Sequence, residues 1–193
     1  MDTTQDRLLA TAADLFAEKG FAAVSMRAIA RALDITQAAI YHHFDNKEEL
    51  YFDSVRYLMR AKVLPILDTC RQESEPEQVL RKFVSGMLTM LQNSPQFLKM
   101  VNREMLDGDE ARLVALSEDV FNDIHATLEA NIAAINPAVD THLSVISMAG
   151  MIFHHAESIK LGKVYPWYKP QYADTGVVAD HISNLLLTGL KGQ

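Results

Sequence analysis

SMRAIARALDITQAAIYHHFDNK, residues 25–47, has the pattern of two short helices joined by a tight turn. Apolar residues recur at spacings of three and four along its first half, as on one face of a helix: Met26, Ile29, Ala30 and Leu33. The Ser25 hydroxyl precedes this run, where it can accept a hydrogen bond from a backbone N–H that lacks a partner within the helix. Residues 34–36 interrupt the pattern, and Thr36 can cap a second helix from Gln37 to about His43 in the same way.

The second helix turns an unusual set of side chains outward when Ile40 and Phe44 face inward: Gln37, Ala38, Tyr41 and His42. A Gln amide can make two hydrogen bonds to adenine in the major groove, and Tyr, Thr and His side chains can reach phosphates. A small residue lets a helix lie close to base edges. Helix-turn-helix geometry also occurs in proteins that never touch DNA, so this stretch alone is equally compatible with two core-forming helices whose exposed residues have no role.

Residues of about 5–52 resemble the N-terminal domain of the tetracycline-repressor (TetR) family of bacterial transcription regulators. The most specific part is the run AIYHHFDNKEEL, residues 39–50. The matching residues are Leu8, Ala12, Leu15, Phe16, Gly20, Phe21, Ser25, Ile29, Ala30, Leu33, Ile35, Thr36, Ile40, Tyr41, His43, Phe44, Lys47, Glu48, Glu49 and Leu50. An ordered set of this length is far more specific than a short motif. Ala38 departs from the family, which often has Gly there, but Ala is also small and favours helix.

The resemblance implies an all-α protein with two domains. The first is an N-terminal three-helix helix-turn-helix domain, residues 1–50. The second is a C-terminal helical ligand-binding and dimerisation domain, residues 51–193, and a linker helix of about residues 46–63 joins the two. The resemblance also implies a homodimer that binds double-stranded operator DNA, usually as a repressor released by a small-molecule effector.

The resemblance assigns DNA contacts residue by residue. Arg27 is expected to contact guanine and Gln37 to contact adenine, with Ala38 lying close to the bases. The expected phosphate contacts are Ser25, Thr36, Tyr41, His42 and Lys47.

Composition is compatible with this interpretation but adds a constraint. The chain has 193 residues, of which 49% are hydrophobic and 22% charged, as in globular proteins with a substantial core. The net charge is −7, and residues 1–60 hold seven basic against nine acidic residues, a net of −2. This count argues against a strongly basic, non-specific nucleic-acid binder. We therefore expect weak non-specific DNA affinity and strong dependence on the dimer.

Other features of the sequence favour a cytoplasmic protein. Cys70 is the only cysteine, so no disulfide can form within the chain and nothing suggests an oxidising compartment. We find no signal-peptide pattern at the N-terminus and no apolar run of about 18 residues that would predict a membrane span.

The chain outside the helix-turn-helix is predicted to be helical throughout. The expected helices cover about residues 3–19, 46–63, 74–93, 94–108, 110–135, 140–160 and 175–190. Pro65 is expected to kink or end the linker helix. Ser74 with Glu77, and Asp45 with Glu48, fit capping boxes at helix starts.

The last two predicted helices are candidates for self-association because apolar residues cover most of their circumference. The expected interface residues are Gly150, Phe153, Ile182, Leu185, Leu186 and Gly189. The alternative is a monomer whose own helices cover these residues. The aromatic loop of residues 161–174, which holds the only Trp, is equally compatible with an interface clasp, a lid over a pocket, or a loop packed on its own subunit.

The family argument places an effector pocket among the helices of the second domain. The expected lining is Phe83, Met87, Met90, Phe97, Met100, Phe121, Met148 and Met151, with His125 and His154 as polar groups. This composition favours a mid-sized, largely apolar or aromatic effector over a sugar or nucleotide. The alternative is that these residues fill a solid core.

No catalytic, metal or cofactor site is predicted. His154 and Glu157 share a helix face, and so do His125 and Glu129, but no further ligand completes either pair, so both are interpreted as hydrogen-bonding or pocket groups. The functional prediction is a sequence-specific DNA-binding regulator. The alternative is a helical ligand-binding or scaffolding dimer without DNA binding. The operator, the effector and the regulated genes cannot be predicted.

Overall fold

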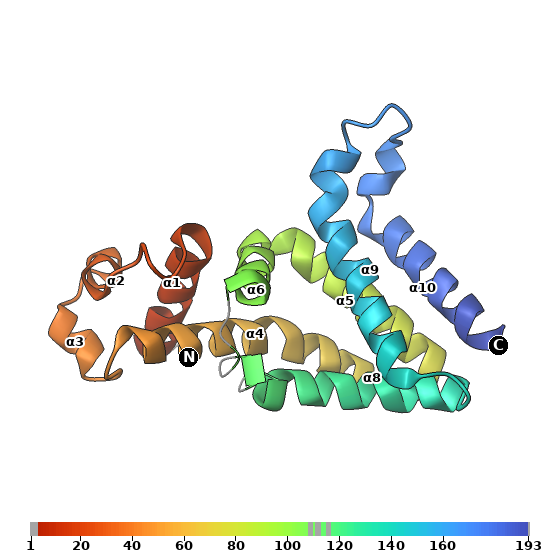
Figure 1. The fold of residues 1–193 in the computed structure, drawn as a ribbon, viewed down its shortest axis with the longest axis horizontal. Helices are drawn as coiled ribbons and strands as arrows, with labels where there is room; N and C mark the ends of the chain where they lie inside the picture. Colours follow the sequence, from red (N-terminus) through yellow and green to blue (C-terminus); the bar gives the residue numbers. More distant parts are fainter. Residues whose placement is uncertain (1–3, 108–109, 111–112, 115–116, 193) are drawn as a thin grey trace. The chain divides into compact units, whose positions relative to one another are not determined.

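The computed structural model describes residues 4–107, 110, 113–114 and 117–192, and their regular secondary structure is entirely helical (Figure 1). This confirms the predicted all-α class. Packing divides the chain into two compact units: unit 1 comprises Met1–Lys62 and Pro95–Val120, and unit 2 comprises Val63–Ser94 and Phe121–Gln193. The division differs from the predicted one, which placed everything after residue 50 in the second domain, because Pro95–Val120 groups with the N-terminal helices.

Unit 1 contains the N-terminal helices and α6. Its helices are α1 (Thr4–Lys19), α2 (Met26–Leu33), α3 (Gln37–Tyr41), the first part of α4 (Lys47–Arg71) and α6 (Pro95–Asp107). The π-helical segment η1 (Ser117–Phe121) lies at the boundary of the units. Helix α1 packs on α2 and on α6, and α2 packs on α3.

The core of unit 1 is formed by the apolar positions that the sequence pattern selects. Its fully buried side chains include Leu8, Phe16, Ile29, Ile40, Phe44 and Leu50. Gly20 follows α1 with a φ of 81°. Glycine adopts this left-handed conformation at little energetic cost because it has no Cβ. The chain can therefore turn directly after α1, and the Phe21 ring packs against Phe16 and Tyr51.

Helix α4 continues past the proline that was expected to kink or end it. It runs from Lys47 to Arg71 with Pro65 inside, whereas the prediction ended it near residue 63. Pro65 removes one N–H from the helix, but one missing bond does not end a helix whose residues on both sides are packed: Val63 and Leu67 are both buried. The α4 residues beyond Lys62 belong to unit 2.

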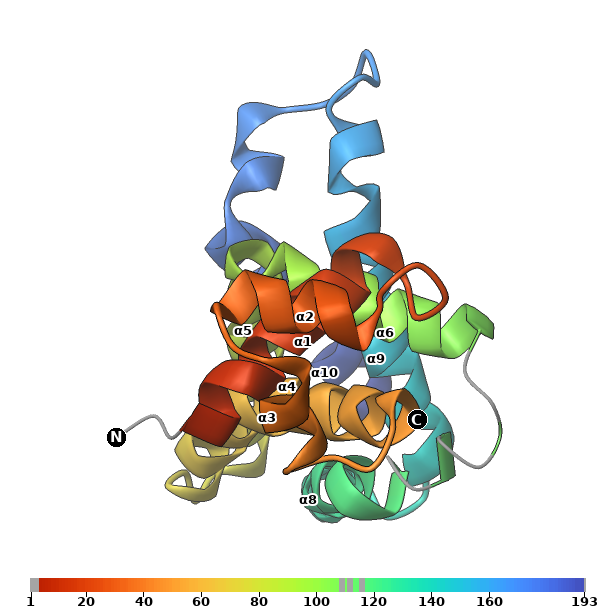
Figure 2. The ribbon, with the colours of Figure 1, turned by 90° about the vertical axis from the view of Figure 1, so that its left-hand side faces the viewer.

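Unit 2 is a layered set of helices. It holds α5 (Pro76–Asn93), α8 (Asn122–Ile135), α9 (Thr141–Gly162), the short 3-10 helix η2 (Pro170–Ala173) and α10 (Thr175–Lys191). Helix α5 packs against α8, α9 and α10. Helices α9 and α10 run side by side, and the loop that joins them lies at one end of the pair (Figures 1 and 2).

Side-chain caps explain where several helices begin. Asp140 caps α9 through Leu143 N–H, and Asp174 caps α10 through Gly176 N–H. Two predicted capping boxes are wrong. Helix α5 starts at Pro76 after Glu75, without a side-chain cap bond, and α4 is capped by Asn46 and Glu49 rather than by Asp45 and Glu48.

No helix in the described parts of the chain combines the length and apolar character needed to cross a membrane.

Candidate DNA-binding surface and ligand-binding interior

Helices α2 and α3 are each capped at their N-terminus by a side-chain hydrogen bond. Ser25 Oγ accepts from Ala28 N–H at 3.2 Å, and Thr36 Oγ1 accepts from Ala39 N–H at 3.2 Å. Asp34 ends α2 in a left-handed conformation with a φ of 55°. Asx side chains tolerate this conformation better than most residues. The buried Ile29 and Ile40 lie beneath the two helices, so α3 is held as a short, rigid element on unit 1.

Seven of the eight predicted DNA contacts are exposed on this framework. They are Ser25, Arg27, Thr36, Gln37, Ala38, Tyr41 and His42. Tyr41 is 50% exposed although it is a large aromatic residue. The hydroxyls of Ser25 and Thr36 accept hydrogen bonds as caps and still have a proton to donate to another acceptor. The outer face of α3 with its flanking residues thus offers donors and an amide to solvent.

Lys47 is the exception, since its ammonium is bound within unit 1. Nζ donates to Phe21 O at 2.7 Å and to Val24 O at 2.9 Å, and it lies 4.0 Å from the centroid of the Phe21 ring. These contacts tie the start of α4 to the segment that follows α1. An ammonium has three donors, so one remains for a phosphate, and the predicted DNA contact of Lys47 stays a prediction.

Residues 8–53 match the sequence profile described as "Bacterial regulatory proteins, tetR family". These residues contain the capped turn and all eight predicted DNA contacts. This segment of the chain is therefore a TetR-type N-terminal domain. The TetR relatives that match by sequence do so over only part of their length. IcaR, a negative transcriptional regulator of the biofilm operon icaADBC from Staphylococcus epidermidis, is 39% identical over 51 residues, which are 26% of this chain and 28% of IcaR. YerO, an uncharacterized HTH-type transcriptional regulator from Bacillus subtilis, is 27% identical over 106 residues, 54% of this chain and 37% of YerO.

Solved structures share the TetR fold over nearly the whole chain. The TetR-family regulator PfmR from Thermus thermophilus has a TM-score of 0.74 at 22% identity and covers 97% of both chains. FadR from Bacillus subtilis, in complex with stearoyl-CoA, has a TM-score of 0.78 at 15% identity, covering 95% of this chain and 97% of FadR. AibR, in complex with isovaleryl coenzyme A and operator DNA, has a TM-score of 0.66 at 22% identity over 96% of both chains. At these low sequence identities, the similarity to the three solved structures shows a shared fold.

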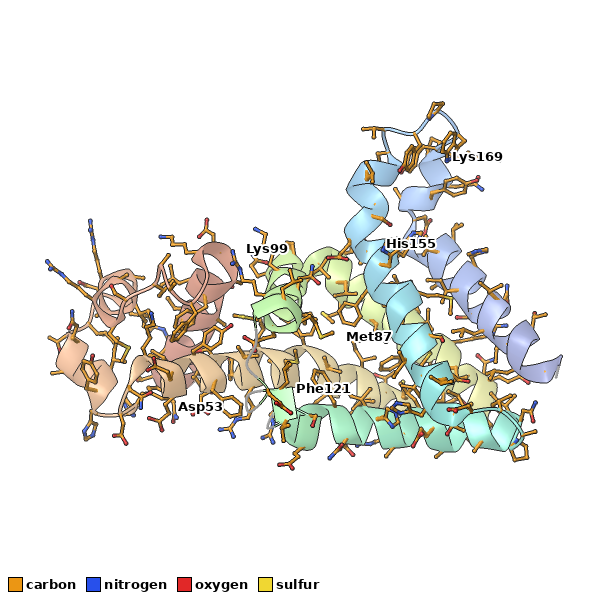
Figure 3. All side chains as sticks on the ribbon, viewed as in Figure 1. Asp53, Met87, Lys99, Phe121, His155 and Lys169 are labelled. Atoms are coloured by element: carbon orange, nitrogen blue, oxygen red, sulfur yellow. The ribbon has the colours of Figure 1, made fainter. Side chains whose placement is uncertain are left out.

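The ten predicted effector contacts differ in burial and in unit. Five are buried: Phe83, Met87, Phe97, Met100 and Met148. Three are half-buried: Met90, His125 and Met151. Phe121 and His154 are exposed. Phe97 and Met100 belong to unit 1 and the other eight to unit 2. Met87 lies on α5, and Phe121 lies at the end of η1 (Figure 3).

Unit 2 contains a small apolar cavity that the sequence did not predict. It has a volume of about 60 Å³ and lies between α5, α9, η2 and α10, lined mainly by Leu88, Leu91, Ala156, Ile159, Tyr172 and Val178. His155 of α9, labelled in Figure 3, is one of its polar lining residues, with Gln92 and Thr175. Burial lowers the pKa of His155, and the nearby His181 and His154 lower it further. The cavity is too small for a drug-sized molecule, which needs about 300 Å³ or more.

Three of the six predicted dimer residues line an open groove of about 340 Å³ between α9 and α10, whose lining is mixed polar and apolar. Leu185, Leu186 and Gly189 line it from α10, and Leu143, Ser147 and Met151 line it from α9. Leu143 and Leu185 are 59% and 57% exposed. By contrast, Ile182 is buried inside unit 2. Ser147 was not predicted at this surface, although its spacing of four from Leu143 and three from Gly150 marks one face of α9.

Proposed function

We propose that this TetR-family chain is a sequence-specific DNA-binding repressor that acts as a homodimer in the cytoplasm and leaves its operator when a small molecule binds. The observation that carries the proposal is the exposure of seven predicted DNA contacts on a capped helix-turn-helix. Charged side chains dominate ordinary exposed helix faces, whereas the outer face of α3 offers Gln37, Ala38 and Tyr41. AibR, which shares the fold, has been solved with operator DNA.

In the proposed complex, α3 enters the major groove. Gln37 reads adenine through its amide, and Arg27, at the start of α2, reads guanine through its guanidinium. Ser25, Thr36, Tyr41 and His42 bind phosphates and fix the register without reading sequence. The two helix-turn-helix units of the homodimer would bind two half-sites of an operator with two-fold symmetry.

The experiment is a binding titration with labelled DNA from upstream of the protein's own gene. Replacing Arg27 or Gln37 by Ala should weaken operator binding by about 1–3 kcal/mol and relax the preference at one base pair of each half-site. Gln78→Ala is a matched control, because Gln78 is exposed on α5 outside the helix-turn-helix. Equal losses on operator and unrelated DNA would show that Arg27 and Gln37 contact only the backbone.

The proposed effector is an acyl-coenzyme A, or a molecule with a comparable acyl chain. FadR is described with stearoyl-CoA and AibR with isovaleryl coenzyme A. The predicted pocket residues of this chain are mostly apolar and suit an acyl chain, with His125 and His154 as polar groups. The nucleotide part of coenzyme A, which this composition does not favour, would then lie outside these residues. Release from DNA requires that the effector bind the DNA-free conformation more tightly, typically by about 1–3 kcal/mol. Titrating the DNA complex with acyl-coenzymes A of increasing chain length, against free coenzyme A, tests this class.

The second candidate is a helical ligand-binding or scaffolding dimer that does not bind DNA. The acidic balance of residues 1–60, with a net charge of −2, favours it. The salt dependence of DNA binding separates the two candidates, because phosphate contacts release counterions and make affinity fall steeply with salt. Retention on operator DNA that is insensitive to salt, or absent at low salt, would favour the second candidate. We assign no catalytic role to either.

A further inference from the structure

Three potential metal ligands from two helices lie together in unit 2. His125 and Glu129 are one turn apart on α8, and His142 lies in the first turn of α9. One ligand atom from each residue can be chosen so that all three lie within 4.8 Å of one another. No third ligand could be predicted for His125 and Glu129, because His142 lies 17 positions beyond His125 and on another helix.

The three side chains lie close together, and rotation of the His125 ring could bring one of its nitrogens toward both partners. His125 Nε2 lies 2.9 Å from His142 Nδ1, and the other ring nitrogen, His125 Nδ1, lies 3.4 Å from Glu129 Oε2. Two ligands on a tetrahedral zinc ion, each about 2.0–2.1 Å from the metal, are roughly 3.3 Å apart. The side chains of His125 and Glu129 are 31% and 35% exposed and His142 is exposed, so all three have room to rotate onto one ion.

The surroundings of the cluster also fit a cation. Thr141 Oγ1 donates to Glu129 Oε1 at 3.0 Å, which orients the carboxylate toward the imidazoles in the manner of supporting groups around metal ligands. The N-terminus of α9 is the positive end of its helix dipole and disfavours a cation there. The Glu129 carboxylate offsets this effect, because it brings a full negative charge to the site whereas a helix end carries about half a charge.

We propose that His125, Glu129 and His142 bind one divalent transition-metal ion of the Zn²⁺ type per chain and thereby cross-link α8 to α9. Two imidazoles and one carboxylate are ligands that suit Zn²⁺, Ni²⁺ and Co²⁺, whereas Mg²⁺ and Ca²⁺ prefer oxygen ligands only. The exposed side of the cluster leaves a fourth position for water, as in zinc sites with three protein ligands. This proposal is independent of DNA binding, but it shares His125 with the proposed effector pocket.

The experiment uses the full chain, freed of metal with a chelator and titrated with Zn²⁺ by calorimetry. We expect one ion per chain and a rise in melting temperature with Zn²⁺. His142→Ala should abolish this binding, and Glu129→Gln should weaken it at least tenfold, since the Gln amide oxygen can still accept the Thr141 hydrogen bond. The visible spectrum of the Co²⁺ form should show the intense bands of a four- or five-coordinate ion in the wild-type protein and lose them in His142→Ala.

The matched control is His154→Ala, which removes an exposed histidine from the same helix, α9, outside the cluster. It should bind Zn²⁺ like the wild-type protein. Circular dichroism of each metal-free variant shows that it is folded. Absence of Zn²⁺ binding, unchanged binding in His142→Ala, or an equal loss in His154→Ala would each overturn the proposal. Unchanged binding in His142→Ala would place the ion elsewhere, for example at His42 and His43, which are adjacent in sequence in unit 1.

Discussion

Lys47 shows how a single residue can support a DNA-binding surface from behind. Its ammonium binds the carbonyls of Phe21 and Val24, just before the helix-turn-helix begins. Lys47→Met keeps an unbranched, mainly apolar side chain and removes both bonds. We expect it to lower the free energy of unfolding by about 1–3 kcal/mol, because hydrogen bonds from a charged, half-buried group are worth more than neutral ones. Chemical denaturation measures this change.

Lys19→Met is the matched control for Lys47→Met, since Lys19 is exposed at the end of α1. Wild-type stability in Lys47→Met would show that the two hydrogen bonds contribute nothing. The same variant tests the phosphate contact, whose loss should reduce the slope of log affinity against log salt by about 1 per half-site. Lower stability with an unchanged slope would assign Lys47 to structure alone.

His155 predicts how stability depends on pH. Its folded-state pKa is lowered, first by burial and then by His181 and His154, from an ordinary value of 6.5. The unfolded chain therefore binds more protons than the folded chain below about pH 7, and stability should fall as the pH drops through 6.5 toward the lowered pKa. His155→Gln should flatten this dependence in thermal unfolding between pH 5 and 7. A slope equally steep in His155→Gln would contradict the assignment of this pH dependence to His155.

At the scale of elements, α6 packs on α1, and Arg103 adds hydrogen bonds between the two helices. Arg103 Nε donates to Ala17 O at 3.1 Å, and its terminal nitrogen donates to Glu18 O at 3.3 Å. These carbonyls belong to the last turn of α1, which a cation stabilises through the helix dipole. Arg103→Met should cost unit 1 about 1–2 kcal/mol and speed amide exchange in the adjoining turn.

Lys99→Met is the control for Arg103→Met, because Lys99 is an exposed cation on the same helix (Figure 3). It should change neither the stability of unit 1 nor the exchange of α1. Exchange in α1 that is equally slow in Arg103→Met would show that packing alone holds the end of α1.

Which elements could be predicted depended on how local their causes are. The starts of α2, α3, α9 and α10 follow from a side chain that caps its own helix, such as Ser25 or Asp140, so neighbouring sequence was sufficient. The end of α4 was not local, because burial of Leu67 outweighs the bond that Pro65 removes. The cap of α4 was misplaced by one residue because Asp45 and Asn46 are both good caps, and only the geometry selects Asn46.

At the scale of the whole molecule, the groove between α9 and α10 supports the proposed homodimer. Leu143 and Leu185 expose more than half of their surface there, which is costly unless another surface covers them. Leu185→Arg should bring charge to the buried interface and shift the protein to monomers, as measured by sedimentation at micromolar concentration. Gly150→Arg should act in the same direction. A Cβ at this position meets no atom within 4 Å in the single chain, so the substitution should not disturb the fold of the chain itself.

Leu106→Arg is the control for Leu185→Arg, because Leu106 is 84% exposed on α6 in unit 1. It should sediment like the wild-type protein. Sedimentation of the wild-type protein as a monomer would contradict the proposed homodimer and, with it, the proposed operator of two half-sites.

Relations between distant parts of the chain were the least predictable from sequence. The grouping of α6 with the N-terminal helices rests on long-range contacts, among them the bonds of Arg103 to carbonyls more than 80 positions earlier and the hydrogen bond of Tyr51 to Glu104. His142 joins His125 and Glu129 only because α8 and α9 pack together. The exposed face of α3 was predictable because helical periodicity and the family pattern together indicate which of its five residues point outward.

Because of Trp167, the tryptophan fluorescence of the protein comes from the α9–α10 loop. It is the only tryptophan, is 70% exposed, and stacks on Tyr165 with ring centroids 5.0 Å apart. Emission excited at the red edge of protein absorption therefore comes from a hydrated indole in this loop, near the labelled Lys169 in Figure 3. It should peak at long wavelength and be quenched readily by acrylamide. A partner or ligand that covers the loop would shift the emission to the blue, whereas unfolding of the buried core would change its wavelength little.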